Sequence, residues 1–231
     1  MKRNLIIIYS RTGSRRLPSK ALLPIKNINL IELIIKRVKK FSDFVDADIV
    51  LATTNKNEDD VLEKIASKNG ICHFRGNELN LVERTLAILK KLKYKNFCRV
   101  NGDCPLVDGN LIKKAYSHLN KNYDLVTNID VRTFPYGIAV EWVDSSVYIK
   151  YASNAFNEEK EHVTKHLYRL KDKINFYNIL NDRDLSHFNL TIDTQKDYEN
   201  FKKLISNAST ENLIEMNFDE ILKNKKNDNS I

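Results

Sequence analysis

Short apolar segments alternate with amphipathic segments through the first hundred residues, and this alternation restricts the possible folds strongly. Residues 4–10, 48–54 and 96–101 are predicted as strands because apolar and β-branched side chains dominate them. Residues 31–41 and 81–92 carry apolar side chains at helical spacing and are predicted as helices. Such a strand–helix alternation indicates an α/β fold with a largely parallel sheet that is covered by helices on both faces.

The pattern is less regular outside these segments. We expect a helix that begins after Asn57 as its N-cap and ends near Gly70, followed by a strand at residues 71–74. Beyond residue 120 the expected strands are 123–128, 138–143, 174–180 and 188–192, and the expected helices are 158–170 and 195–205. The prediction is therefore an α/β core that continues into a mixed β insertion.

A length of 231 residues is enough for one well-buried domain with a small extension. We assign residues 1–206 to the main domain and residues 207–231 to a C-terminal extension. The extension is rich in Asn, Lys and Ser but contains an amphipathic turn around Phe218 and Ile221. We expect this turn to dock on the core and the last few residues to be a disordered polar tail.

Positive charge is concentrated at the start of the chain. The formal net charge is +8, and no acidic residue precedes Glu32. Seven cationic residues lie in this stretch: Lys2, Arg3, Arg11, Arg15, Arg16, Lys20 and Lys26. This concentration favours a local anionic ligand over a general nucleic-acid surface, although Lys-rich composition alone is an alternative explanation.

Cysteines and apolar runs limit the cellular setting. Cys72, Cys98 and Cys104 are odd in number and form no CxxC pair, which fits a reducing cytoplasm and favours neither a disulfide framework nor a zinc site. No apolar run approaches the length of a membrane span. We therefore expect a cytoplasmic protein that neither inserts into membranes nor binds nucleic acid.

The first predicted strand runs directly into a cationic loop, residues 10–20. Ser10, Gly13 and Ser14 supply small side chains, and Arg11, Arg15, Arg16 and Lys20 supply charge. Ligands of open α/β sheets bind beyond the carboxyl ends of the strands, and backbone N–H groups together with guanidinium groups match phosphate oxygens. The spacing is neither that of a Walker loop nor G-x-G-x-x-G. A solvated basic turn is the alternative.

Two aspartates also follow predicted strands. Asp103 lies between Gly102, which permits an unusual backbone angle, and a stiffening Pro105. Asp193 ends another apolar segment, although Asp193 or Thr194 could instead cap the helix that follows. Because Mg²⁺ prefers one or two carboxylates with phosphate oxygens and water, the two aspartates could share one metal.

Three sequence pieces together resemble one enzyme family. They are residues 11–20 (RTGSRRLPSK), 101–106 (NGDCPL) and 192–194 (IDT), supported in the same order by 57–61, 74–76, 81–84 and 161–164. This combination, spread over residues 4–206, resembles the bacterial cytidylyltransferases of surface-sugar synthesis. It is most similar to the spore-coat polysaccharide branch, and more distantly to the enzymes that activate 3-deoxy-manno-octulosonate and acylneuraminate.

The resemblance implies a Rossmann-like nucleotidyltransferase sheet of the glycosyltransferase-A type, spanning residues 1–206 as a cytidylyltransferase domain. It also implies that the protein transfers CMP from CTP to an acidic sugar or phosphorylated acceptor, releases pyrophosphate, uses Mg²⁺ and forms a homodimer. Carried over by position, the implied triphosphate ligands are Arg11, Arg16 and Lys20, with Ser10, Gly13 and Ser14 in the same loop. Arg15 is not required by the family register.

The remaining implied roles concern the metal, the nucleoside and the acceptor. The resemblance makes Asp103 and Asp193 the metal ligands, and Arg16, Lys20 and Asp103 the catalytic residues. Gly76, Arg84 and Asn101 would lie near the base or ribose. The predicted acceptor contacts are Tyr136, Glu141, Glu161 and His162, while Arg132 could meet a carboxylate or phosphate. Tyr136 and Glu141 could instead shape a strand turn and a dimer surface.

Two other functions remain compatible with the sequence. A glycosyltransferase on a similar fold would usually need an Asp-x-Asp type of metal motif, whereas residues 101–103 supply a single acid. A non-catalytic nucleotide-binding protein would not need both candidate metal aspartates. His162 and His166, four residues apart on a predicted helix, could ligate a metal, but the zinc-protease pattern is absent.

Overall fold

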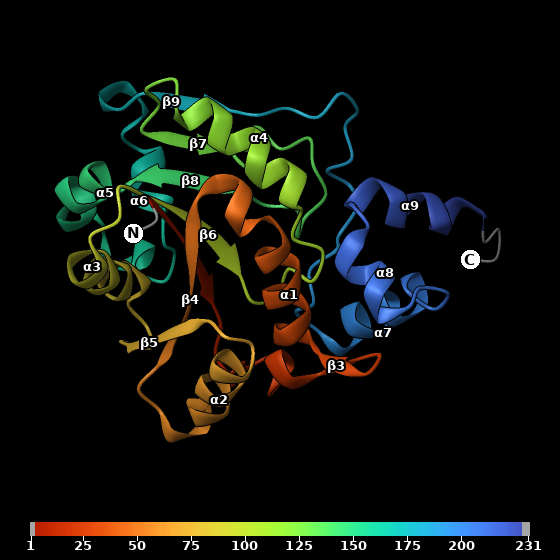
Figure 1. Cartoon of the computed structure of the whole chain (residues 1–231). Coiled ribbons are helices and arrows are strands. Elements are labelled where there is room, and N and C mark those ends of the chain that lie inside the picture. Colours follow the sequence, from red (N-terminus) through yellow and green to blue (C-terminus); the bar gives the residue numbers. More distant parts are fainter. Residues whose placement is uncertain (1–2, 228–231) are drawn as a thin grey trace.

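The computed structural model describes residues 3–227 and contains a seven-stranded sheet with the order β5-β4-β1-β6-β8-β7-β9 (Figure 1). Its strands are β1 (Asn4–Tyr9), β4 (Ala47–Thr54), β5 (Cys72–Gly76), β6 (Asn96–Asn101), β7 (Leu125–Thr127), β8 (Glu141–Asp144) and β9 (Phe176–Asn178). The four strands from β5 to β6 are parallel, β8 pairs antiparallel with β6 and β7, and β9 returns parallel to β7. The predicted mixed β region therefore extends the same sheet.

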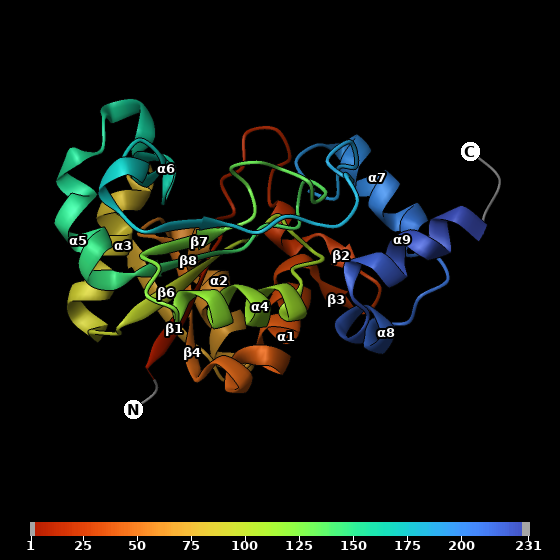
Figure 2. The same ribbon diagram turned by 90° about the horizontal axis from the view of Figure 1, so that it is seen from above.

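Helices cover both faces of this sheet, as predicted (Figure 2). The longer helices are α1 (Leu30–Ser42), α2 (Asp60–Lys68), α3 (Leu81–Leu92), α4 (Gly109–Leu119) and α7 (Gln195–Leu204). The shorter ones are α5 (Ser145–Tyr151), α6 (Lys165–Tyr168), α8 (Thr210–Glu215) and α9 (Phe218–Asn227), and a small hairpin joins β2 (Pro24–Ile25) to β3 (Ile28–Asn29). No helix of the described chain is long and apolar enough to cross a membrane.

The alternation of side chains along each strand divides the core into two clusters. On β6, Cys98 and Val100 face the cluster that α1, α2, α4 and the C-terminal helices cover. Phe97 faces the other cluster, which α3, α5 and α6 cover. Arg99 has the same parity as Phe97, so β6 also turns polar side chains toward the second face of the sheet near its carboxyl end.

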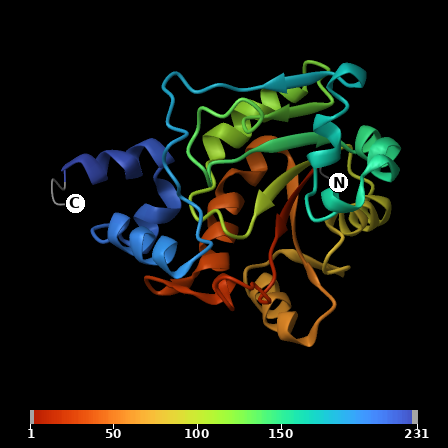
Figure 3. The same ribbon diagram turned by 180° about the vertical axis from the view of Figure 1, so that it is seen from behind.

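The C-terminal segment packs on the first core cluster, at one end of the molecule (Figure 3). Phe218 and Ile221 are buried there, as expected for the amphipathic turn. Arg37 of α1 is itself buried and donates to the carbonyl oxygens of Val107, Leu213 and Met216. These bonds tie α8 and its C-terminal flank to the body of the fold. The expected disordered tail lies outside the described residues.

Several predicted elements differ from the structure. Asp59, not Asn57, precedes α2, because residues 57–59 form a separate 3-10 turn. Residues 188–192 are not a strand, since they contribute one isolated bridge between Tyr136 and Asn189. The expected helix at 158–170 is broken into a 3-10 turn and the four-residue helix α6. The helices α4 and α5 were not predicted.

Candidate active site

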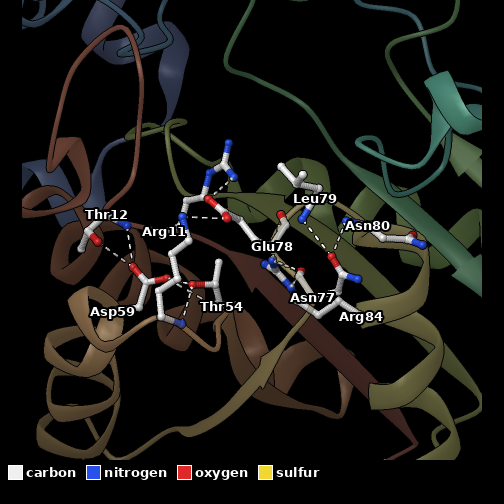
Figure 4. Close-up of polar contacts among 10 residues, drawn as sticks. Arg11, Thr12, Thr54, Asp59, Asn77, Glu78, Leu79, Asn80 and Arg84 are labelled. Carbon is white, nitrogen blue, oxygen red and sulfur yellow. Dashed lines mark hydrogen bonds and ion pairs between the residues drawn. The ribbon is translucent and has the colours of Figure 1, made fainter.

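The cationic loop is fixed to the sheet by one buried carboxylate. Oδ1 of Asp59 accepts hydrogen bonds from the backbone N–H and the hydroxyl of Thr12, both at 2.7 Å (Figure 4). Its Oδ2 accepts from the backbone N–H and the hydroxyl of Thr54 at the end of β4. Burial raises the pKa of Asp59, but the hydrogen bonds from Thr54 and Thr12 outweigh burial and lower it. Asp59 therefore stays ionised and holds the loop in place.

A second loop, residues 77–80, faces the cationic loop. Oε1 of Glu78 lies 3.2 Å from Nη1 of Arg11 (Figure 4). Its Oε2 lies 2.8 Å from Nζ of Lys56. Hydrogen bonding to Lys56 lowers the pKa of Glu78. Arg11 is thus paired with a protein carboxylate, which a phosphate group would have to replace.

Arg84 of α3 holds the backbone of this second loop. Its guanidinium donates to the backbone carbonyl oxygens of Asn77 and Glu78, and the residue is almost fully buried (Figure 4). Burial lowers its pKa. Gly76 packs against it, because a Cβ on this glycine would lie 2.9 Å from Cγ of Arg84. The predicted nucleoside contacts Gly76 and Arg84 therefore support the 77–80 loop, and Arg84 also lines the cleft.

The two strand-end aspartates, predicted to share one metal, converge in the structure on the ammonium group of Lys20. Nζ of Lys20 lies 2.9 Å from Oδ2 of Asp103 and 2.8 Å from Oδ1 of Asp193. Arg16 pairs with the other oxygen of Asp193 at 3.1 Å. Burial lowers the pKa of Lys20, but the charges and hydrogen bonds of Asp103 and Asp193 outweigh burial and raise it. Thr194 caps α7, so the Asp193 side chain is not used as the cap.

Gly102 brings the ends of β1 and β6 together. It does not have a positive φ, contrary to the expectation of an unusual backbone angle. Instead, a Cβ at this position would lie 2.7 Å from the carbonyl oxygen of Tyr9 and from the side chain of Ser10. A side chain is excluded here because the start of the cationic loop packs directly against the turn that carries Asp103.

These groups line one cleft of about 480 Å³ at the carboxyl ends of the parallel strands. The predicted site residues that line it are Ser10, Arg11, Ser14, Arg16, Lys20, Arg84, Asn101, Asp103, Glu161, His162 and Asp193. The structure also brings Arg15 and Arg99 into the lining. Six cationic side chains and four carboxylates, Glu78, Asp103, Glu161 and Asp193, thus surround the cavity. A cleft with this excess of positive charge suits a polyanion.

The wall opposite the cationic loop comes from residues 160–163. The backbone N–H of Leu81 donates a hydrogen bond of 2.7 Å to the carbonyl oxygen of Lys160. This bond joins the wall to the start of α3. Glu161 and His162 line the cleft from irregular backbone, not from the predicted helix. Burial, followed by the charges of Lys165 and Arg99, lowers the pKa of His162. His166 is buried elsewhere in α6, so the two histidines do not form a metal site.

Besides Gly76, three predicted contacts do not line the cleft. Tyr136 is 53% exposed on a loop, with the Arg132 guanidinium 4.3 Å from its ring centre. Gly13 faces Glu58, whose Oε1 would lie 2.6 Å from an added Cβ. Glu141 is fully buried in β8, where a substrate cannot touch it. The prediction of Glu141 as a direct contact is therefore wrong, because the pleat of β8 turns this side chain into the core.

Sequence reasoning missed the two arginines for different reasons. Arg15 was left out although it stands in the cationic loop, and no described residue forms an ion pair or hydrogen bond with its side chain. Arg99 stands inside a predicted apolar strand, where a single charge carries little signal. Arg99 lies two residues before Asn101, at the end of a strand that was already assigned to the site. This position could have indicated that its side chain reaches the cleft.

The carboxylates of Asp103 and Asp193 suit a divalent cation whose remaining coordination positions are filled by substrate oxygens and water. Among residues 3–227, no group of three or more His, Cys, Asp and Glu side chains could hold a metal by itself. Asp103 and Asp193 nevertheless lie close enough to share the one ammonium group of Lys20. Two carboxylates with free positions for phosphate oxygens and water match the preference of Mg²⁺.

Comparisons with known proteins identify one enzyme family. The sequence model of the family described as Cytidylyltransferase matches residues 5–227. The spore coat polysaccharide biosynthesis protein SpsF of Bacillus subtilis (strain 168) is 31% identical over 214 residues, which is 88% of this chain and 87% of that protein.

Solved structures extend the comparison. A cytidylyltransferase from Leptospira borgpetersenii has a TM-score of 0.89 at 32% identity, covering 98% of this chain and 95% of its own. CMP:2-keto-3-deoxy-manno-octonic acid synthetase, solved in complex with CTP, has a TM-score of 0.69 at 15% identity, covering 88% and 98%. The second likeness concerns the fold, which is that of Rossmann-like nucleotidyltransferases. The family match and the two relatives above 30% identity show that the chain belongs to the cytidylyltransferase family.

Proposed function

We propose that the chain transfers CMP from CTP to an acidic sugar or phosphorylated acceptor, with release of pyrophosphate, in the synthesis of a surface polysaccharide or glycoconjugate. The observation that carries the proposal is the convergence of Lys20, Asp103 and Asp193 in the cleft that the cationic loop lines. Family membership favours this reaction over glycosyl transfer and over non-catalytic nucleotide binding. The relative SpsF, by its name, belongs to polysaccharide synthesis.

The triphosphate would lie on the cationic loop. Arg11, Arg16 and Lys20 line the cleft within one loop that Asp59 holds through Thr12. Each would exchange its carboxylate partner for phosphate oxygens when CTP binds. Arg15 offers a further cation without a protein partner among the described residues. Ser10, Ser14 and Asn101 line the same cavity and supply hydrogen-bonding groups for the nucleotide.

Asp103 and Asp193 would hold Mg²⁺ together with phosphate oxygens, once Lys20 turns from the carboxylates to the phosphates. The bound ion would supply neutralisation of phosphate charge and polarisation of the reacting oxygens. The protein itself would orient the α-phosphorus of CTP for in-line attack by an acceptor oxygen. Arg16 and Lys20 would stabilise the negative charge that gathers on the departing pyrophosphate.

The proposal also includes an acceptor-binding side of the cleft, a homodimer and a cytoplasmic location. Glu161 and His162 line the cleft opposite the cationic loop, which supports a role in acceptor binding. The exposed apolar side chains of Val131 and Leu180, near the mixed end of the sheet, support an interface with a second copy. The proposal of a reducing compartment rests on the three cysteines, Cys72, Cys98 and Cys104, which are odd in number and form no CxxC pair.

The test is pyrophosphate release from CTP and Mg²⁺ in the presence of single acceptors. The panel contains a keto-sugar acid, a sugar phosphate, a polyol phosphate and a phosphonate, with ATP, GTP and UTP as nucleotide controls. We expect one acceptor class to give release that depends on CTP and on Mg²⁺. Stabilisation by a nucleotide diphosphate sugar, without stabilisation by CTP, in a thermal melt would contradict the proposal.

A further inference from the structure

Arg99 occupies the floor of the cleft, between its two halves. β6 lies between β1, which leads into the cationic loop, and β8, which begins the mixed part of the sheet. The side chain of Arg99 is 13% exposed, and the exposed part belongs to the cleft. A largely buried guanidinium group therefore lines the cavity, together with Glu161 and His162 of the 160–163 wall.

A fully buried carboxylate fixes this guanidinium from behind. Nε of Arg99 forms an ion pair with Oε2 of Glu141, directly across the β6–β8 pair. The other oxygen of Glu141 accepts hydrogen bonds from the hydroxyls of Thr164 and Tyr168, both at 2.6 Å. Tyr168 is in turn bonded to Thr127 of β7 at 2.8 Å. The arrangement restrains Arg99 more than an exposed ion pair would, because every partner is set in the sheet or in the segment that covers it.

The guanidinium retains binding capacity toward the cavity. An arginine has five N–H donors, and among the described residues Glu141 is the one carboxylate that pairs with Arg99. Burial lowers the pKa of Arg99, but the charge of Glu141 outweighs burial and raises it, so the group stays charged. An anion entering from the cleft meets the guanidinium, whereas Glu141 lies behind it.

The position of Arg99 separates it from the groups that would hold the triphosphate. Arg11, Arg16 and Lys20 belong to the loop after β1, and Glu78 and Leu79 belong to the loop after β5. Arg99 lies on the other side of β1, next to β8 and close enough to influence the pKa of His162. The loops assigned to the nucleotide thus lie on the β5-β1 side of the cleft, and the end of β6 carries Asn101 beside them. The side next to β8, where Arg99 lies, is left for the second substrate.

We propose that Arg99 binds the oxyanion of the acceptor, a carboxylate or a phosphate, and that Glu141 is the positioning residue that aims it. The inference rests on the proposed function, because it assigns the second substrate of the same cleft. A fork of parallel N–H donors matches two oxygens of one oxyanion, which fixes the orientation of the acceptor as well as its affinity. Glu141 contributes to acceptor selection without touching the acceptor.

The experiment measures binding of two anionic probes to the full-length protein by calorimetry. The protein is first saturated with MgCl₂ and a non-hydrolysable CTP analogue, so that the triphosphate subsite is filled. N-acetylneuraminate is the carboxylate probe, glycerol 3-phosphate is the phosphate probe, and glycerol is the neutral control. We expect the wild-type protein to bind one anionic probe but not glycerol, and the probe that binds identifies the class of oxyanion.

Substitutions then test Arg99 itself. Arg99→Gln should weaken binding of that probe by about tenfold to a hundredfold, as expected for a lost charge-assisted hydrogen bond. Arg99→Lys should weaken it less, and the affinity for the CTP analogue should stay within about twofold in both. Arg132→Gln is the matched control, because this arginine stacks on Tyr136 outside the cleft. Tyr168→Phe removes one donor to Glu141 and should weaken probe binding about twofold to fivefold with CTP-analogue binding intact.

The outcomes separate the two proposals. Wild-type protein that binds the CTP analogue but neither anion, or Arg99→Gln protein that binds the anion normally, overturns the role of Arg99 and leaves CMP transfer standing. Wild-type protein that binds no CTP analogue overturns both. A probe lost equally in Arg132→Gln would move the acceptor site out of the cleft and contradict the inference.

Discussion

The ammonium group of Lys20 lies 2.9 Å from the carboxylate of Asp103, although the two residues are 83 positions apart in the chain. Asp193, from a third part of the chain, is the second carboxylate that pairs with Lys20. A lysine between two carboxylates is itself a cation in a place where a divalent cation would be well bound. We therefore expect Lys20 to change partners when CTP and Mg²⁺ bind together.

Replacing Asp103 with Asn should abolish this exchange. The neutral amide keeps the size of the side chain but removes half of the negative charge available to the metal, so pyrophosphate release should fall roughly a hundredfold or more. The same change at Asp193 should have a similar effect. Asp172→Asn, an exposed change on a turn outside the cleft, is the control and should keep wild-type turnover. Full activity of Asp103→Asn at low Mg²⁺ would contradict the metal role.

Arg15→Ala tests the cation that the family resemblance does not require. Arg15 lines the cleft without an ion-pair partner among the described residues, so its removal should not alter the melting temperature of the free protein. If it binds phosphate, the KM for CTP should rise about tenfold, which corresponds to one charge-assisted hydrogen bond. An unchanged KM would mean that this side chain stays in solvent while the nucleotide binds.

Glu78→Gln should strengthen CTP binding. Glu78 pairs with Arg11 and Lys56, so the carboxylate competes with the triphosphate for at least one cation. Without this competition we expect the dissociation constant for CTP to fall severalfold, with the difference shrinking as salt screens the charges. Calorimetric titration at low and high ionic strength measures both effects. Weaker CTP binding in this variant would show instead that Glu78 organises the 77–80 loop for the nucleotide.

His166 should make the folded state sensitive to mild acid. It is fully buried in α6, and burial lowers its pKa from 6.5 to about 4, with Glu159 and Arg169 as the charged groups that face it. Below pH 6.5 His166 is protonated in the unfolded chain but stays neutral in the folded protein. The free energy of unfolding therefore falls as the pH drops from 6.5 toward 4. A shift of this size corresponds to about 3 kcal/mol at most.

Denaturant melts of the wild-type protein and of His166→Phe, compared between pH 7 and pH 4, measure this loss. Phe retains the contact with the ring of Tyr148 but has no proton to bind. The variant should therefore lose less stability over this interval than the wild-type protein. Hydrogen bonding to Arg169 lowers the pKa of Glu159 to about 2. The stability that Glu159 contributes is therefore lost only from about pH 4.5 downward, which separates it from the effect of His166.

The parts of the fold that were predicted correctly are those in which one periodicity runs without interruption. Residues 81–92 and 96–101 match α3 and β6 to the residue, because apolar spacing and helix caps agree there. Residues 158–170 failed because the same apolar side chains are used by a 3-10 turn, a cleft wall and α6. The spacing of apolar residues alone does not distinguish one continuous helix from an irregular segment that buries the same residues.

The site shows a similar division. The cleft contains the residues that follow strands, such as Lys20 and Asp103, because the ends of parallel strands meet at one edge of a sheet. The Glu141 role could not be predicted, since it depends on the pleat and on the antiparallel pairing with Arg99 across two distant segments. Pairing partners and strand phase are properties of the assembled sheet.

The burial of Glu141 also limits how such a protein can diversify. Surface loops can exchange residues singly, but a carboxylate that joins β8, β7 and the 164–168 segment cannot be altered without repacking its neighbours. A change of acceptor would thus be reached more readily through Glu161 or His162, at the rim of the cavity, than through its floor. Libraries that vary the rim and keep Glu141 constant should retain far more folded members than libraries that vary both.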